Sequence, residues 1–249
     1  MSRTLLEARG LRKAFGGMTA VDNVDLDIVS GRITGIIGPN GAGKTTLVHL
    51  LTGHLVPDAG SIRFEGGDIT NLPSHERVRR HISRTFQVVD VFARLTVFQN
   101  VEIACLTRLG HNRRFLRRSG PEVAAKVEQV LSEVGLWELR HRRADQLSHG
   151  QQRRLDFAVA LASEPRLCFL DEPTSGVSPR ERDQVLDLIR SLAAARRTDF
   201  VIIEHDMELV FTLCDWVMVM HRGAVLAEGG PDDIRDNTAV RDVYLGEDA

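Results

Sequence analysis

The sequence predicts an α/β fold with a mainly parallel sheet, and two kinds of pattern support this prediction. Short apolar runs typical of buried strands occur at ITGIIG, LCFL and FVII, and each ends in a glycine-rich or polar stretch. Helical patterns such as TLVHLL and VAAKVEQVLSEVGL lie between these runs. In open parallel sheets, ligands bind at the carboxyl ends of the strands. We therefore expect the functional residues directly after the apolar runs.

The composition is that of an ordinary globular protein. The chain has 249 residues, of which 43% are hydrophobic and 27% charged, and its net charge of −2 argues against nucleic acid as a partner. The three cysteines are far apart in sequence, which favours a reducing compartment over a disulfide or zinc framework. The sequence contains neither an apolar run of membrane-spanning length nor a signal-peptide pattern, so we expect any membrane association to be peripheral.

A glycine-rich loop follows the first apolar run. GPNGAGKTT, residues 38–46, matches the nucleotide-binding pattern G-x-x-x-x-G-K-[ST], and TLVHLL after it predicts a helix. The glycines allow backbone N–H groups to face phosphates, Lys44 adds a positive charge and the Thr45 hydroxyl is a ligand for Mg²⁺. The alternative, a glycine turn that caps an ordinary helix, does not explain the complete match. The predicted contacts of a nucleoside triphosphate in this loop are Gly38, Asn40, Gly41, Gly43, Lys44, Thr45 and Thr46.

Two acidic residues end the second apolar run. Asp171 and Glu172 follow LCFL, and consecutive strand residues point in opposite directions, so we expect them to have different roles. Asp171 is predicted to bind Mg²⁺ through water, and Glu172 to be the general base for an attacking water. A charged strand end entering a turn explains two acids, but it does not explain their place after a buried strand.

Two further polar positions carry weaker signals. His205 follows the apolar run FVII, where its side chain can reach the same sheet edge as the glycine loop. A lone histidine is more often structural, and Glu204-His205-Asp206 lacks the spacing of helical metal ligands. Gln87 in SRTFQVVD has no meaning by itself.

The stretch LSHGQQ predicts a helix that begins with unusually polar residues. Ser148 and Gln151 have the spacing of a capping box. That motif does not account for Gly150, because glycine weakens the first turn of a helix. A helix start with free N–H groups, a hydroxyl and a glycine also suits an anion.

In this order, GPNGAGKTT, SRTFQ, LSHGQ, LCFLDEP and IIEHD resemble the nucleotide-binding ATPases of ABC transporters over nearly the whole chain. The resemblance implies a P-loop NTPase core with an N-terminal antiparallel β subdomain and a helical subdomain that carries the LSHGQ signature. It also implies that two subunits, identical or different, pack head to tail on two MgATP. The ATP bound by one subunit would then contact Ser148, Gly150 and Gln151 of the other.

The resemblance assigns roles to other positions. Phe15 would stack on adenine, although a core aromatic is the alternative. Gln87 would contact Mg²⁺ or water and the membrane partner, and Glu172 and His205 would act in hydrolysis. Residues 174–179 would form the D-loop at the dimer interface. In the commonest family patterns His149 is glycine and Ser178 is aspartate, and the second difference leaves the coupling between the two ATP sites open.

Within the family, ISRTFQVVDVFARLTVFQNVEIA, LSHGQQRRLDFA and VYLGE resemble bacterial uptake ATPases for branched-chain amino acids, with urea-uptake ATPases nearby. This implies a transmembrane permease as partner, a periplasmic solute-binding protein upstream of it, and a location at the cytoplasmic face of the inner membrane. An ATPase for another solute or for an exporter is the alternative. GTPases are excluded because no N/T-K-x-D motif occurs, and condensin-type ATPases because long heptad coiled coils are absent.

The organisation along the chain predicts one domain, 1–249. Its core is expected at about 1–87 and 160–249, and its helical subdomain at about 88–159. Residues 1–30 have the alternating pattern of antiparallel strands, and WVMVMHRGAVLAEG predicts a hairpin that turns at Arg222-Gly223. The basic segment 108–121 is either a solvated loop or a contact with lipid headgroups or the permease.

Overall fold

The computed structural model describes residues 3–85, 91–108, 120–195 and 198–245. The chain forms two compact units, one of Met1–Arg77 with Asp199–Ala249 and the other of Val78–Thr198. The first is called the P-loop unit below, and the second the signature unit. The predicted division into a core and a helical subdomain at about 88–159 stays a prediction.

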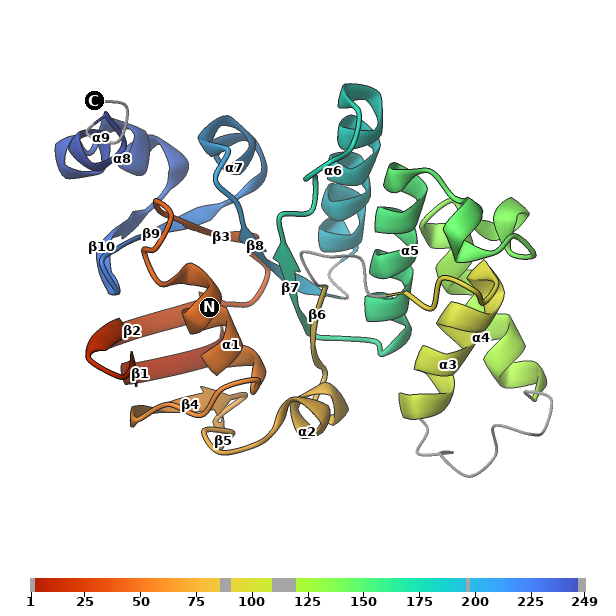
Figure 1. Cartoon of the computed structure of the whole chain (residues 1–249), viewed down its shortest axis with the longest axis horizontal. Coiled ribbons are helices and arrows are strands. Elements are labelled where there is room, and N and C mark those ends of the chain that lie inside the picture. Colours follow the sequence, from red (N-terminus) through yellow and green to blue (C-terminus); the bar gives the residue numbers. More distant parts are fainter. Residues whose placement is uncertain (1–2, 86–90, 109–119, 196–197, 246–249) are drawn as a thin grey trace. The chain divides into compact units, whose positions relative to one another are not determined.

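The P-loop unit contains an antiparallel sheet in the order β2-β1-β4-β5 (Figure 1). Its strands are β1 (Thr4–Phe15), β2 (Met18–Val29), β4 (Ala59–Phe64) and β5 (Gly67–Asp68). In β1 the buried residues Leu6 and Ala8 alternate with more exposed ones, because one face of the sheet covers the core and the other meets water. This confirms the antiparallel strands predicted for the N-terminal residues.

A second sheet of this unit has the strand order β10-β9-β3-β8. Its strands are β3 (Thr34–Ile37), β8 (Asp199–Ile203), β9 (Trp216–His221) and β10 (Ala224–Gly229). Strand β3 pairs in parallel with both β8 and β9, and its residues are all buried. The hairpin β9–β10 turns at Arg222 and Gly223, whose φ angles of 48° and 83° confirm the predicted turn.

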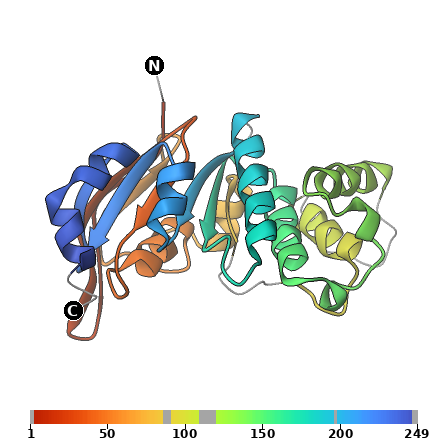
Figure 2. The same ribbon diagram turned by 90° about the horizontal axis from the view of Figure 1, so that it is seen from above.

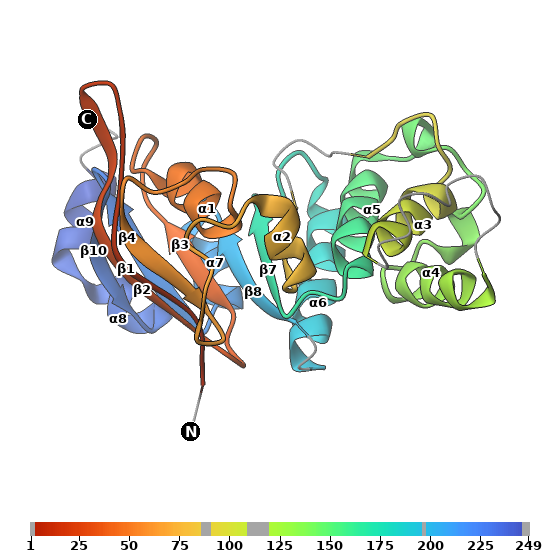
Figure 3. The ribbon, with the colours of Figure 1, turned by 90° about the horizontal axis from the view of Figure 1, so that it is seen from below.

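Helices flank this second sheet. They are α1 (Lys44–Thr52), α7 (Met207–Leu213), α8 (Pro231–Asp236) and α9 (Thr238–Leu245), while α2 (Ser74–Arg79) follows the antiparallel sheet in sequence. Helices α8 and α9 lie beside β10 (Figures 2 and 3). None of the described helices combines the length and the apolar character that crossing a membrane requires.

Arg77 anchors the end of α1. Its side chain is buried, and its guanidinium donates to the carbonyl oxygens of Leu50 and Leu51 at 2.7 and 2.9 Å. These carbonyls lie in the last turn of α1, where the Leu50 carbonyl also accepts a hydrogen bond from the N–H of Gly53 at 3.3 Å. Burial lowers the pKa of Arg77 to about 10, so the side chain remains a cation at neutral pH. The helix that follows the glycine loop is therefore held at its far end.

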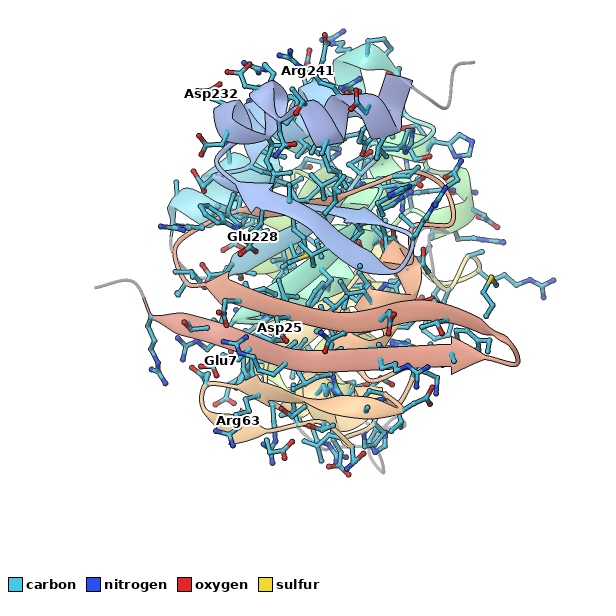
Figure 4. The ribbon with its side chains drawn as sticks, turned by 90° about the vertical axis from the view of Figure 1, so that its left-hand side faces the viewer. Glu7, Asp25, Arg63, Glu228, Asp232 and Arg241 are labelled. Atoms are coloured by element: carbon cyan, nitrogen blue, oxygen red, sulfur yellow. The ribbon has the colours of Figure 1, made fainter. Side chains whose placement is uncertain are left out.

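Charged side chains cover the outer face of the antiparallel sheet. Glu7 on β1 lies opposite Arg63 on β4, and Asp25 on the neighbouring β2 accepts a hydrogen bond from the N–H of Gly10 (Figure 4). Opposite charges across neighbouring strands stabilise a sheet by about 0.2–1 kcal/mol for each pair. This face therefore presents polar groups to water.

Where the structure describes it, the signature unit combines two parallel strands with four helices. Strands β6 (Ile82–Arg84) and β7 (Leu167–Asp171) pair with each other. The helices are α3 (Val97–Arg108), α4 (Pro121–Glu133), α5 (His149–Ala162) and α6 (Pro179–Ala194), with short 3-10 turns at Trp137–Leu139 and Ala144–Gln146. Helices α3, α4 and α5 pack side by side (Figures 1 and 3). The apolar face of α4 is buried, as its helical periodicity predicts.

The three cysteines are buried thiols. Burial is the main cause that raises the pKa values of Cys168 and Cys214 to about 12. The thiolate, the reactive form, is therefore suppressed at both positions.

Candidate functional site

The glycine loop joins β3 to α1 in a backbone conformation that requires glycine at two positions. Gly38 and Gly43 have φ angles of 150° and 98°. A Cβ atom on Gly38 would lie 2.2 Å from the carbonyl oxygen of Met220, and one on Gly43 would lie 2.2 Å from that of Ala20. These glycines are required because neighbouring backbone approaches the loop from β9 and from β2.

Backbone hydrogen bonds hold the loop from outside. The N–H of Gly223, in the β9–β10 turn, donates to the carbonyl of Ala42 at 3.0 Å. The N–H of Asp22 in β2 donates to the carbonyl of Gly223 at 2.8 Å. Loop, hairpin turn and β2 thus form a continuous network. A loop restrained in this way loses less conformational entropy when it binds a ligand.

The Lys44 ammonium lies within the curl of the loop, where it donates to the carbonyls of Gly38 at 2.5 Å and Pro39 at 2.9 Å. Helix α1 begins at Lys44, so its first N–H groups have no intrahelical acceptors. Asn40, Gly41 and Thr45 are exposed beside this helix start. The backbone N–H groups and the lysine ammonium suit the phosphate oxygens of a nucleotide, and the hydroxyl oxygen suits its Mg²⁺.

Phe15 lies at the end of β1, directly before the turn to β2. It is 46% exposed and pairs in the register with Met18, which is 70% exposed. The alternative that Phe15 is a core aromatic is therefore excluded. The ammonium of Lys13 lies 5.9 Å from the ring centroid. Because β2 contacts the glycine loop through Ala20, an exposed aromatic ring stands near the phosphate cradle within the same unit.

His205 follows β8 at the sheet edge from which the glycine loop leaves β3. Ile36 of β3 pairs with Ile203 of β8, which places the ends of the two strands side by side. The side chain of His205 is 68% exposed, whereas its neighbour Glu204 is buried, with a carboxylate 3.8 Å from His205 Nδ1. The glycine loop, Phe15 and His205 thus belong to the same unit, and their joint contact with one nucleotide stays a prediction.

In the signature unit, Asp171 lies at the end of β7 and forms a buried ion pair. Its carboxylate accepts a hydrogen bond from the Arg84 guanidinium at 2.6 Å, and both side chains are less than 8% exposed. Arg84 comes from β6, which pairs with β7. Arg84 is not among the residues predicted from the sequence. The feature that could have indicated it is an arginine inside the short strand pattern that precedes Gln87.

Glu172 adopts a backbone conformation that is rare for residues with side chains. Its φ angle is 46°, and its carbonyl accepts a hydrogen bond from the N–H of Ser175 at 3.1 Å. Such left-handed residues cost roughly 1–3 kcal/mol and are concentrated at functional sites. Asp171 is buried at the end of β7, whereas Glu172, the next residue, lies in the turn and is only half-buried. The two acids therefore have different surroundings, as their adjacent positions predict.

The predicted capping box at the start of α5 is confirmed. Ser148 Oγ accepts from the N–H of Gln151 at 3.2 Å, and Gln151 Oε1 accepts from the N–H of Ser148 at 3.0 Å. Ser148 and His149 are exposed, so the helix start is open to solvent apart from contacts within the unit.

Glu181 connects this helix start to the next one. The residue is the third of α6, where it forms a second capping box with Ser178. Its Oε2 accepts a hydrogen bond from Ser178 Oγ at 2.8 Å, and its Oε1 accepts one from Ser148 Oγ at 2.9 Å. Hydrogen bonds from the hydroxyls of Ser178 and Ser148 lower the pKa of Glu181, which keeps it ionised at neutral pH.

Glu181 also explains Gly150. A Cβ atom on Gly150 would lie 2.5 Å from both Cδ and Oε1 of Glu181. The capping box alone does not account for this glycine, and the group that approaches it within this chain is a carboxylate. Sequence reasoning missed Glu181, although Ser178-x-x-Glu181 has the spacing of a capping box.

The remaining predicted features are Gln87, the basic segment and the D-loop. Gln87 lies outside the described residues, as do residues 109–119 of the basic segment 108–121. The predicted D-loop, residues 174–179, is described and runs from the turn after Glu172 to the start of α6.

Comparison with known families gives two matches. A family model described as ABC transporter matches residues 21–175, which is more than half of the chain. A second, described as branched-chain amino acid ATP-binding cassette transporter, matches residues 224–249.

Curated relatives match over almost the full length. BraF of Pseudomonas aeruginosa, a high-affinity branched-chain amino acid transport ATP-binding protein, is 41% identical over 99% of this chain and 100% of its own. LivG of Escherichia coli strain K12, described in the same words, is 37% identical over 99% and 100%. LptB of Acidithiobacillus ferridurans, a lipopolysaccharide export system ATP-binding protein, is 37% identical over 98% and 97%.

Among solved structures, the ADP conformation of an ATP-binding cassette of an ABC transporter matches with a TM-score of 0.88 and 31% identity. The match covers 98% of this chain and 99% of the other. The predicted fold class is thereby confirmed. With its phosphate cradle, its signature helix and relatives that match from end to end, the chain belongs to the ABC transporter family as one of its ATPases.

Proposed function

We propose that this chain is the ATP-hydrolysing subunit of an ABC importer for branched-chain amino acids. The observation that carries the proposal is the restrained glycine loop before α1, with Lys44 in its curl and Phe15 exposed beside it. The likeness to BraF and LivG supports the choice of solute. Two subunits, identical or different, would close head to tail on two MgATP.

Within the P-loop unit, the residues bind and orient ATP. The N–H groups of Gly41, Gly43 and Lys44 would contact the phosphates, and the Lys44 ammonium would leave the carbonyl oxygens of its own loop for the β and γ phosphates. Thr45 would hold Mg²⁺, which neutralises phosphate charge when bound. Phe15 would stack on the adenine ring, and His205 would contact the γ-phosphate.

Within the signature unit, Glu172 would accept a proton from the attacking water, and Asp171 would orient water around Mg²⁺. Ser148, Gly150 and Gln151 would contact the ATP held by the partner subunit. Gln87 would contact Mg²⁺ or water and transmit closure to a transmembrane permease. We place the chain at the cytoplasmic face of the inner membrane, peripherally attached through that permease, with a periplasmic solute-binding protein delivering substrate.

Uptake measurements test the solute. Cells whose chromosomal copy carries Glu172→Gln are expected to lose uptake of labelled leucine and to keep uptake of labelled urea, because the permease is no longer driven. Cells carrying Glu122→Gln, which removes an exposed carboxylate at the start of α4, are the matched control and should transport normally.

The opposite result would move the assignment. Loss of urea uptake alone would indicate the neighbouring urea systems. Normal uptake of both solutes would favour a different transporter. The likeness to LptB makes lipopolysaccharide export the first alternative to examine, by measuring lipopolysaccharide at the cell surface.

Phe15→Ala tests adenine stacking. We expect ATP affinity to fall about tenfold, because stacking of a base on an aromatic side chain contributes roughly 1–3 kcal/mol. Calorimetric titration with ATP and with inorganic tripolyphosphate measures the effect, and tripolyphosphate affinity should not change. Met18→Ala, at the paired position of the hairpin, is the control. An equal loss of tripolyphosphate affinity would show that Phe15 supports the loop rather than the base.

A further inference from the structure

We infer that Glu181 is a positioning residue that opposes closure of the ATP-bound dimer until ATP displaces it from the signature helix. The inference rests on the proposed function, because it requires that the partner's ATP contacts Ser148 and Gly150. In the free subunit, the Glu181 carboxylate takes the place of an anion at the start of α5.

The geometry of Glu181 is that of a bridge between two helix starts. One carboxylate oxygen accepts from Ser148 at the start of α5, and the other accepts from Ser178 at the start of α6. Both starts are favourable places for negative charge, because the N–H groups of a first helical turn carry partial positive charge. One ionised side chain therefore accepts hydrogen bonds at the starts of two helices. Its partner Ser148 lies 33 residues before it in the sequence.

The carboxylate and a phosphate compete for the same groups. The Ser148 hydroxyl has one hydrogen, so it donates either to Glu181 or to the γ-phosphate of the partner's ATP. The carboxylate also covers Gly150 so closely that a Cβ atom there would lie 2.5 Å from it. Two negative groups at this helix start repel each other. ATP must therefore displace the Glu181 carboxylate from Ser148 and Gly150 before the signature helix binds it.

Displacement has a consequence for the D-loop. Glu181 lies in the first turn of α6, directly after residues 174–179. When its carboxylate leaves Ser148, its remaining hydrogen bonds among the described residues are those of the α6 capping box around Ser178, and its charge also interacts with Arg154. ATP arriving at α5 thereby changes the hydrogen bonding at the start of α6. This connects the signature sequence to the D-loop within one subunit.

The test measures how much ATP is needed to form the dimer. The full-length chain carrying Glu172→Gln is titrated with MgATP, and dimer formation is followed by light scattering behind size-exclusion chromatography. Adding Glu181→Ala should lower the ATP concentration at the midpoint about fivefold, since a hydrogen bond of roughly 1 kcal/mol no longer has to be broken. Glu181→Gln, which keeps the size and an acceptor oxygen but removes the charge, should lower it by a smaller factor.

The control is Asp233→Asn, which removes a carboxylate at the corresponding third position of α8, where it accepts a hydrogen bond from the N–H of Gly230 at 3.2 Å. Its midpoint should equal that of the parent. A lost helix cap alone lowers the thermal unfolding temperature, and it gives no reason for dimers to form at lower ATP concentrations.

The outcomes separate this inference from the proposed function. If the parent dimerises with ATP but both Glu181 variants have an unchanged or higher midpoint, Glu181 does not oppose closure and the inference is overturned. If neither the parent nor any variant dimerises with ATP, the head-to-tail mechanism fails, and the inference fails with it.

Discussion

Replacing Glu172 with glutamine is expected to lower the kcat for ATP hydrolysis about 10²- to 10⁴-fold, the usual contribution of a general base. The glutamine side chain has nearly the same size and still accepts a hydrogen bond from water, but it does not take a proton. ATP binding depends on the P-loop unit, so the KM for ATP should change little. Phosphate release from the purified chain measures the effect.

The same variant should accumulate as an ATP-bound dimer, because in the proposed mechanism hydrolysis reopens the two subunits. The strained backbone of Glu172 makes it important that the substitution does not unfold the turn. Far-UV circular dichroism and the thermal unfolding temperature check this. Glu122→Gln is the control for kcat. If Glu172→Gln hydrolyses ATP at the wild-type rate, Glu172 is not the general base.

Replacing Arg84 with methionine is expected to lower the free energy of unfolding by about 3–5 kcal/mol, because it leaves the buried Asp171 carboxylate without its ion-pair partner. Methionine fills a comparable volume but carries no charge. Urea titration followed by circular dichroism measures the loss. Arg84→Lys retains the charge and should recover part of the stability.

A matched control removes an exposed ion pair instead. Arg190 and Asp187 pair at 3.2 Å with side chains 44% and 75% exposed, so Arg190→Met should cost less than about 1 kcal/mol. If Arg84→Met costs no more than this control, the Arg84–Asp171 pair does not stabilise the signature unit. Adding Asp171→Asn to Arg84→Met should restore part of the stability, since the unpaired charge is then gone.

Much of the candidate site was predictable because its residues belong to local motifs. Each of these motifs is defined by residues close together in sequence. They are the glycine loop, the acids at the end of β7, the histidine after β8 and the capping box of α5. Short-range spacing decides where a helix starts or a strand ends. The β9–β10 hairpin was predictable for the same reason, since two adjacent residues with positive φ set its turn.

Phe15 shows where such reasoning stops. The sequence allowed either an adenine contact or a core aromatic, because a strand pattern does not tell which side of a hairpin end is covered. Phe15 pairs with Met18 at the end of the hairpin, where Gly16, Gly17 and Met18 are exposed as well. This information depends on how β1 pairs with β2 and packs on the rest of the unit.

The fold class, the family resemblance, and the loops and helix starts proposed to bind ATP were all predictable from the order of residues. Which distant groups meet at these loops and helix starts depends on the folded chain. Arg84 pairs with Asp171 across 87 residues, and Glu181 reaches Ser148 across 33. The physical reason is that local motifs act over a few residues, whereas these contacts depend on strand register and helix packing. Those are determined by the whole chain.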